Sequence, residues 1–126
     1  MTVVIDSSAV LAILKNERGG DQAISLSRGA LLSAVNLIEV RSKLMEAVSD
    51  AERALSTLDR LEINVVPFTP HQGRMAADLW PIVKGKSVSL ADRACIALAI
   101  DKNATLVTAD RGWAKLGLSL DLAFIR

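Results

Sequence analysis

The sequence contains few residues of several chemically informative types. Cys95 is the only cysteine among 126 residues, so the chain cannot form an internal disulfide bond. His71 is the only histidine, and one histidine with one cysteine is too few for a typical zinc site. Tyrosine is absent and aromatic residues make up 3% of the chain. The two tryptophans, Trp80 and Trp113, are better explained by packing than by stacking on nucleobases.

Long hydrophobic runs are also missing. The longest, "AVLAIL" and "ACIALAI", are far shorter than the roughly 20 apolar residues that a membrane-spanning helix needs. The first residues, "MTVVIDSS", include an acid and no basic segment, which argues against a secretory signal. We therefore expect a soluble, cytoplasmic protein that has no membrane partner.

Neither sign of charge dominates, because 15 basic and 14 acidic side chains give a net charge of +1. The chain has no block of lysine and arginine, and tight binding to a nucleic-acid duplex usually requires such clusters. This balance argues against a high-affinity duplex binder. It does not exclude an enzyme that contacts a short piece of RNA.

Short β-branched segments alternate with longer segments of helical periodicity along the whole chain, without repeats or linkers. This alternation is typical of an α/β fold, with a parallel sheet flanked by helices on both faces. We expect one domain over residues 1–126. The expected strands are 2–6, 30–35, 63–68, 104–110 and 120–126, and the expected helices are 7–16, 21–28, 35–48, 51–61, 69–83, 87–100 and 111–117.

Local signals support several of these boundaries. Thr69 is a suitable N-cap and Pro70 suits the first helical position, where its missing N–H is not needed. Pro81 is expected to kink or end the same helix. The segment "SDAE", residues 49–52, is typical of a capping box between two helices. A glycine pair at 19–20 is expected to stop the first helix.

Two acids should emerge at one edge of the sheet. Asp6 ends the first expected strand and Asp110 immediately follows the fourth. Because the carboxyl ends of parallel strands share one edge, and ligands of such sheets bind beyond that edge, both carboxylates should face a ligand there.

Two further acids lie on helices that could reach this edge. Asp92 is in the first turn of its helix, in line with Cys95 and Ile96 on a face that must be covered. Its carboxylate should therefore lean toward protein or a ligand. Glu39 lies nearly opposite the apolar side of the helix at 35–48, so periodicity alone does not bury it.

Converging carboxylates require a counter-charge. Two unit charges 4 Å apart repel by about 4 kcal/mol at an effective dielectric constant near 20. All-oxygen ligands favour Mg²⁺ or Mn²⁺ over Zn²⁺. Such an ion suits hydrolysis of a phosphodiester by activated water. The acids therefore predict a metal-dependent phosphodiesterase.

Each acid also has a purely structural explanation. Asp6 could cap the following helix, and Asp92 forms an S-x-x-D capping pattern with Ser89. Asp110 is an ordinary turn or N-cap residue, and Glu39 could simply be solvated. Spacing alone leaves both explanations open.

Four segments together resemble the PIN-domain ribonucleases, specifically the VapC toxins of bacterial toxin–antitoxin modules. The segments are "VVIDSSAVLAIL", "SAVNLIEV", "SLADRACIALA" and "TLVTADRGWAKL", in the family's order. The resemblance implies a PIN-like fold with a five-stranded parallel sheet. It also implies that Asp6, Glu39, Asp92 and Asp110 are catalytic acids that hold one or two Mg²⁺ or Mn²⁺ ions.

The same resemblance implies supporting residues and partners. Ser7 and Thr108 match small hydroxyl positions beside the first and last acids. The implied activity is an endoribonuclease that cuts RNA with metal-activated water. The implied partners are a VapB-type antitoxin, whose tail occupies the catalytic groove, and a second copy of the chain in a homodimer. Many relatives carry another acid where this chain has Gly112 and Trp113, so the resemblance does not supply a full second set of ligands.

Other functions explain the sequence less well. A DNA-directed nuclease of the same superfamily would share the acids, but it usually needs additional segments to grip DNA. A catalytically weak PIN-like protein-binding module would be expected to lack one acid, and all four are present. We expect Asp92 to face a divalent cation and Arg93 to fix the start of its helix.

Overall fold

Five parallel strands form the centre of the computed structural model, which describes residues 1–126. The strands run in the order β3-β2-β1-β4-β5, and every neighbouring pair is parallel. This confirms the expected parallel sheet. The strand bounds are β1 Val3–Ile5, β2 Leu31–Ser33, β3 Asn64–Val66, β4 Thr105–Thr108 and β5 Leu122–Phe124.

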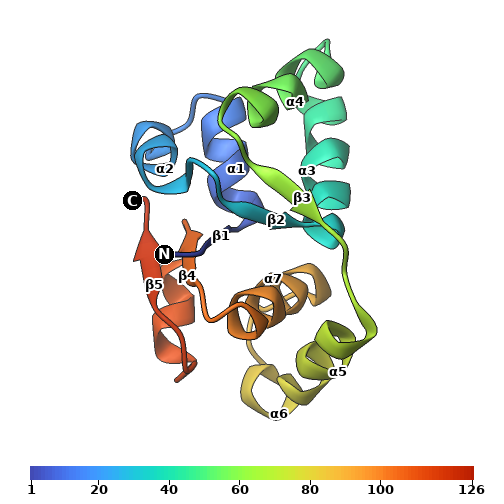
Figure 1. The fold of residues 1–126 in the computed structure, drawn as a ribbon, viewed down its shortest axis with the longest axis vertical. Helices are drawn as coiled ribbons and strands as arrows, with labels where there is room; N and C mark the ends of the chain where they lie inside the picture. The colour runs from blue at the N-terminus through green and yellow to red at the C-terminus, as the bar shows by residue number, and fades with distance from the viewer.

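Seven α-helices cover the sheet on both faces (Figure 1). Helices α1 to α4 lie on one face, and α5 to α7 lie on the other. Their bounds are α1 Ser7–Leu14, α2 Gly20–Ser27, α3 Ala34–Ala47, α4 Ala51–Arg60, α5 Pro70–Asp78, α6 Trp80–Val83 and α7 Leu90–Asp101. A short 3₁₀ helix, η1 Arg111–Lys115, links β4 to β5.

The hydrophobic core has two parts because side chains alternate across each strand. Ile5 of β1 and Val107 of β4 pack with α1, α2, α3 and α4. Val4 and Leu106, their neighbours in sequence, pack with α6, α7 and η1. The central strands are therefore buried on both sides, which explains their continuous apolar sequence.

Proline and threonine set the bounds of α5 and α6 as expected. The Thr69 hydroxyl accepts a hydrogen bond from the Gln72 amide at 3.1 Å, and Pro70 occupies the first turn of α5. α5 ends at Asp78, and Pro81 lies in the first turn of the separate helix α6. The expected break near Pro81 is confirmed.

Two local expectations need correction. The first helix ends at Leu14, before the glycine pair, because the chain turns through Asn16 with φ of 52°. Asparagine adopts this left-handed conformation more readily than most residues. Gly19, with φ of 89°, instead precedes the first turn of α2.

The expected capping box at 49–52 is not formed. Asp50, and not Ser49, is the N-cap of α4, and its carboxylate accepts a hydrogen bond from the Arg53 amide at 3.0 Å. Arg53 occupies the third helical position, where a capping box needs an acceptor side chain. The reciprocal bond therefore cannot form.

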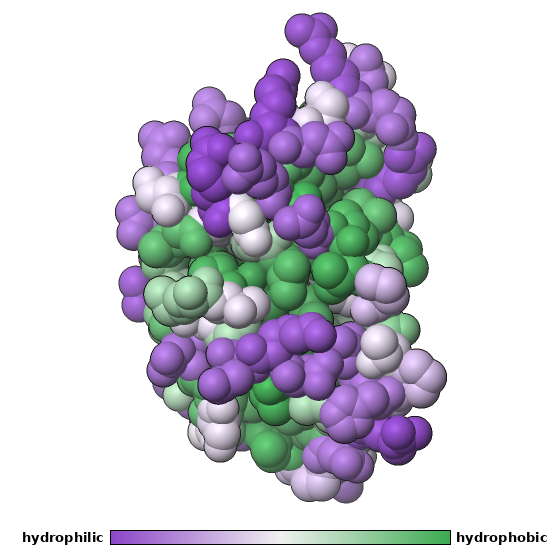
Figure 2. All heavy atoms as spheres, in the orientation of Figure 1, coloured by the Kyte–Doolittle hydropathy of each residue, from purple (hydrophilic) through white to green (hydrophobic).

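Polar side chains gather over α4 at the top of the molecule, and hydrophobic residues are exposed across its middle (Figure 2). Val65 on the edge strand β3 is 43% exposed. None of the helices has the length and apolar character needed to traverse a bilayer.

Candidate active site

The candidate site lies at the carboxyl ends of β1 and β4, which are neighbours in the sheet. The strand order reverses between them, because β2 and β3 follow β1 on one side and β5 follows β4 on the other. The Asp6 amide donates to the Val107 carbonyl at 2.9 Å and extends the pairing by one residue. Crevices at such reversal points are where α/β sheets bind ligands.

Asp6 is held at this point by hydroxyl groups. Its side chain is buried, with 3% of the residue exposed. One oxygen, Oδ2, accepts hydrogen bonds from Ser8 Oγ at 2.6 Å and Thr108 Oγ1 at 2.9 Å. The other oxygen, Oδ1, is buried without a hydrogen-bond partner. Asp6 occupies the N-cap position of α1, yet its side chain makes no capping hydrogen bond.

Burial raises the pKa of Asp6 from 3.8 to about 6, and the charge of Asp92 adds to this effect. The hydrogen bonds from Ser8 and Thr108 act in the opposite direction. At neutral pH the carboxylate is therefore a buried anion with one free oxygen. Such a group is costly unless a cation or donor meets it.

Two hydroxyls connect Asp6 to the end of β4. Ser8 Oγ accepts from the Ala109 amide at 3.0 Å, and Thr108 Oγ1 accepts from the Asp110 amide at 3.0 Å. Both hydroxyls donate to Asp6 Oδ2. The position of the acid is thus fixed by the same groups that fix the segment leading to Asp110.

Ser7, the first residue of α1, is bonded to α3. Its hydroxyl is buried and donates to the Asn36 carbonyl of α3 at 3.4 Å, and it does not bond to Asp6. The serine hydroxyl that bonds to Asp6 is that of Ser8, the next residue. The reason is geometric, because the first residue of α1 points toward α3 while the second reaches back to the N-cap. The role that the resemblance implies for Ser7 stays a prediction.

Asp92 makes the capping box that its sequence predicts. Its Oδ2 accepts from the Ser89 amide at 2.8 Å, and the Ser89 hydroxyl accepts from the Asp92 amide at 3.0 Å. Burial raises the pKa of Asp92, and the charges of Glu39 and Asp110 raise it further, against the hydrogen bonds from Ser89. The structural role is therefore present, and it leaves Oδ1 without a protein partner.

Glu39 and Asp110 complete the group. Glu39 is half-buried on α3, with its side chain 28% exposed, and Oε2 lies 3.8 Å from Lys43 Nζ. Asp110 is the N-cap of η1, and its Oδ1 accepts from the Gly112 amide at 2.9 Å. Both charges act on Asp92, so α3, α7 and η1 bring their acids to one region.

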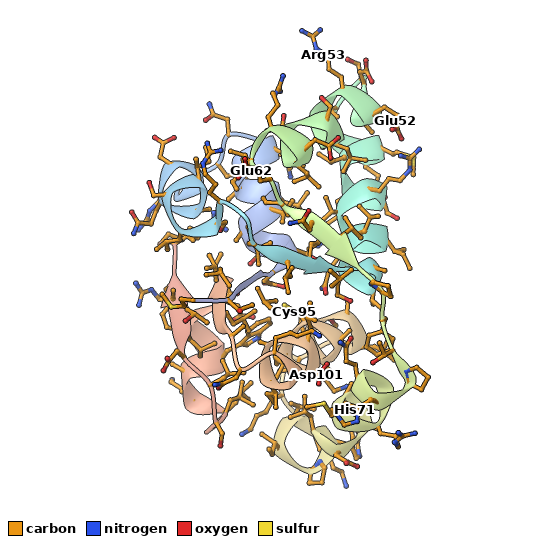
Figure 3. The ribbon with its side chains drawn as sticks, in the orientation of Figure 1. Glu52, Arg53, Glu62, His71, Cys95 and Asp101 are labelled. Atoms are coloured by element: carbon orange, nitrogen blue, oxygen red, sulfur yellow. The ribbon has the colours of Figure 1, made fainter.

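Cys95 lies beneath this region, between α7 and the sheet (Figure 3). Its thiol is fully buried, and Sγ is 4.0 Å from the Ile5 carbonyl. Burial raises the pKa of Cys95 well above its ordinary value, and the charges of Asp6, Asp92 and Glu39 raise it further. Acids from three elements therefore converge above one buried thiol.

The acids are electrostatically coupled, but they do not form a compact ligand set. No three histidine, cysteine, aspartate or glutamate side chains are arranged to hold one metal ion. The chemistry of the group still fits a hard cation, because all its ligand atoms are carboxylate oxygens and Asp6 Oδ1 has no partner. Gly112 and Trp113 supply no fifth carboxylate.

Sequence reasoning missed two supporting residues. Ser8 lies two residues after Asp6, a spacing that allows its hydroxyl to reach back to the carboxylate. Asn36 is fully buried on α3, and its Nδ2 donates to the Ala91 carbonyl at 3.1 Å, next to Asp92. The signal for Asn36 was its helical spacing with the buried Val40, which places an amide on the apolar face.

Arg93 fixes α7 against α5 and does not pair with the acids. Its Nη1 donates to the Ala76 carbonyl at 3.3 Å, and its guanidinium lies 5.5 Å from the centre of the Trp80 ring. Trp80 is about half exposed at the edge of the molecule, whereas Trp113 is buried in the core.

Comparison with known families identifies the fold. The family model that describes the PIN domain matches residues 3–118 of the chain. The chain belongs to the PIN-domain family. PIN domains are typically nucleases and generally use divalent metals.

Several solved structures resemble this PIN domain at low sequence identity. VapBC2 from Rickettsia felis, bound to a DNA fragment from its promoter, has a TM-score of 0.77 and 19% identity, with 98% of each chain covered. Mycobacterium tuberculosis VapC20, described as a Sarcin-Ricin loop cleaving toxin, has a TM-score of 0.76 and 16% identity over 93% of this chain and 96% of that one. VapBC-5 from the same organism has a TM-score of 0.67 and 25% identity over 99% and 97%. Among curated protein sequences, none matched the chain.

Proposed function

We propose that this PIN domain is a metal-dependent endoribonuclease toxin of the VapC type, which hydrolyses phosphodiester bonds in RNA. One observation carries the proposal. Asp6 is deeply buried at the reversal point of the sheet, has an oxygen without a partner, and lies within electrostatic range of Asp92. A buried anion of this kind is complementary to a divalent cation.

The four acids Asp6, Glu39, Asp92 and Asp110 would hold Mg²⁺ or Mn²⁺ through carboxylate oxygens. When bound, such an ion stabilises the charge that develops on the phosphate and makes water more acidic. The ion would also offset the burial, and the smaller repulsion between the acids, that raise the pKa of Asp6 and Asp92.

The protein's own residues orient the two most constrained acids. Ser8 and Thr108 hold one oxygen of Asp6, and the Ser89 amide holds one oxygen of Asp92. Each carboxylate then presents its second oxygen in a defined direction. Such outer contacts fix the orientation of metal-binding carboxylates and lower the cost of ordering them on binding.

The substrate and partners are inferred from the likeness to VapC proteins. We infer RNA as substrate, an antitoxin of the VapB type as partner, and a homodimer as the functional form. The solved VapBC structures from Rickettsia felis and Mycobacterium tuberculosis support an antitoxin as partner. The description of VapC20 as a Sarcin-Ricin loop cleaving toxin supports RNA as substrate.

Cleavage of a structured RNA by the purified full chain tests the proposal. We expect cleavage with Mg²⁺ or Mn²⁺ and none in EDTA. Asp6→Asn and Asp92→Asn should each lower the cleavage rate by about 100-fold or more. The reason is that losing even a group that only hydrogen-bonds to a metal ligand typically lowers metal affinity or activity by about 10–100-fold. Asp59→Asn, on the exposed side of α4, is the matched control and should cleave like the wild type.

Three outcomes would contradict the proposal. Cleavage that persists in EDTA and in both aspartate variants would remove the acids from the reaction. Equal cleavage of single-stranded DNA would favour a DNA-directed nuclease. A folded protein that cuts no nucleic acid and does not arrest growth when overexpressed would favour a protein-binding module.

A further inference from the structure

A second feature of the molecule lies directly beside the acids. A cavity of about 400 Å³ is bounded on one side by the loop that precedes α7 and on the other by η1. The first segment leads into Ser89 and Asp92, and the second begins at Asp110. The residues that line it include Lys86, Ser87, Val88, Asp110, Trp113 and Lys115.

The walls of this cavity combine an apolar floor with a basic rim. Trp113 is buried and Val88 is half-buried, whereas Lys86, Ser87 and Lys115 are exposed. Neither lysine forms a salt bridge. Trp113 Nε1 is buried without a hydrogen-bond partner, so a residue of the wall carries a donor that the protein leaves unused.

We propose that this cavity receives one nucleobase of the RNA, turned out of the strand beside the bond that is cut, while Lys86 and Lys115 neutralise the neighbouring phosphates. The proposal rests on the ribonuclease function proposed above. It names the substrate class as single-stranded or looped RNA, because a base inside a duplex is stacked and cannot enter a pocket.

Size, polarity and charge each favour a base with its phosphates. The volume falls in the range of about 300–1,000 Å³ that is usual for small-ligand pockets. The apolar floor formed with Trp113 suits the flat face of a base. The two exposed lysines suit phosphate, which lysine neutralises as a point charge.

The other cavity of the molecule lacks these properties. It has about 250 Å³ and lies between α3, α5 and α7, with walls that include Phe68 and Leu90. Its only charged residue is Arg93, whose guanidinium already contacts Ala76 and Trp80. This cavity therefore offers one cation that is already packed against protein groups, whereas the cavity beside the acids has two exposed lysines.

Abasic RNA provides a direct test. The cut site of the wild-type chain is first mapped on a structured RNA, and a short RNA spanning it is made with single abasic nucleotides at successive positions. We expect one abasic position to lower kcat/KM by about tenfold, the size of one base contact. Ser87→Trp, which fills the mouth of the cavity, should lower kcat/KM similarly on intact RNA and make the enzyme insensitive to that abasic position.

Matched variants separate the pocket from general effects. Ser25→Trp, on the exposed surface of α2, should behave like the wild type. The double variant Lys86→Glu and Lys115→Glu should raise KM several-fold and weaken its dependence on salt, and Lys102→Glu should not. The lysines are exposed, so this pair tests the pocket even if Ser87→Trp does not fold.

The outcomes distinguish the two proposals. The base pocket is refuted, and the ribonuclease function stands, if Ser87→Trp and the double lysine variant cleave RNA like the wild type. The same holds if Ser87→Trp lowers kcat/KM by the same factor on abasic RNA as on intact RNA, so that the two effects are independent. If the wild type binds a labelled oligouridylate without cutting any RNA, and Ser87→Trp abolishes that binding, the pocket stands and the ribonuclease function is refuted. If the wild type neither binds nor cuts RNA, both are refuted.

Discussion

Asp6 and Asp92 both lie at the starts of helices, α1 on one face of the sheet and α7 on the other. The Asp6 side chain makes no capping bond and is held by hydroxyls from Ser8 and Thr108. The Asp92 side chain completes a capping box with Ser89. Asp6 is the N-cap of α1, whereas Asp92 is the third residue of α7, and the two acids have different relations to their own helices.

This difference shows that a structural role and a functional role are compatible in one carboxylate. At Asp92, one oxygen caps the helix and the other is free of the protein. At Asp6, the helix start lacks a side-chain cap, and burial without a partner for Oδ1 raises the pKa. We therefore expect substitutions at the two helix starts to affect stability in opposite directions.

Asp6→Asn should produce the largest change in stability. The folded-state pKa of Asp6, about 6, lies above the ordinary 3.8, so folding favours the neutral carboxyl. The stability that this group contributes is present below about pH 4 and is lost as pH rises through 6. A difference of this size corresponds to about 3 kcal/mol. Asparagine carries no charge to bury, so in EDTA at pH 8 the variant should be more stable than the wild type.

Urea unfolding in EDTA at several pH values measures this effect. The advantage of Asp6→Asn should be nearly constant above the folded-state pKa of about 6, shrink as pH falls through 6, and vanish near pH 4. Asp59→Asn should change stability by no more than about 0.5 kcal/mol, as is usual for a surface position. An Asp6→Asn variant that is less stable than the wild type at pH 8 would show that the carboxylate has a compensating partner.

Ser8→Ala tests the group that orients Asp6. The change removes the 2.6 Å hydrogen bond to Asp6 Oδ2 and the acceptor of the Ala109 amide. We expect RNA cleavage to fall by about tenfold, the lower end of the effect of outer contacts at metal sites. Ser7→Ala is the matched variant, since Ser7 bonds to α3, and it should reduce cleavage far less. The opposite ranking would favour the role that the family resemblance implies for Ser7.

Ser89→Ala should have the smallest effect of the three. It removes the hydroxyl that caps α7, and loss of an N-cap typically costs about 1 kcal/mol. Thr69→Ala removes the corresponding cap of α5 at a comparable cost. Thermal unfolding should place the two variants close together, whereas only Ser89→Ala should slow RNA cleavage, because the lost hydroxyl accepts from the Asp92 amide and so fixes the turn that carries this acid. The bond from the Ser89 amide to the Asp92 carboxylate remains, so the loss of activity should be small. Equal activities would confine Ser89 to a structural role.

Periodicity and local motifs in the sequence predicted most of the fold. Continuous β-branched segments predicted buried parallel strands, and Thr69, Pro70 and Pro81 predicted where α5 and α6 begin or end. The misplaced boundaries depended on single-residue details. Asn16 rather than glycine ends α1, and Arg53 prevents a capping box at α4.

The arrangement around the acids was harder to predict, because it depends on contacts between distant segments. The strand-end rule correctly placed Asp6 and the segment containing Asp110 at one edge of the sheet. Periodicity could not predict the burial of Glu39, whose side chain is only 28% exposed in the folded chain. The bond between Ser8 and Asp6, and the bond from Asn36 to Ala91 55 residues away, depend on side-chain orientations and tertiary packing that periodicity does not encode.

The single thiol offers a way to observe motions of this region. Cys95 is sealed between α7 and β1, and only an ionised, accessible thiol reacts quickly with alkylating reagents. The rate at which it is modified therefore measures how often α7 moves away from the sheet. A cation that binds the overlying carboxylates together should slow that reaction. The modification rate of this native cysteine can therefore report local opening of the structure without any introduced label.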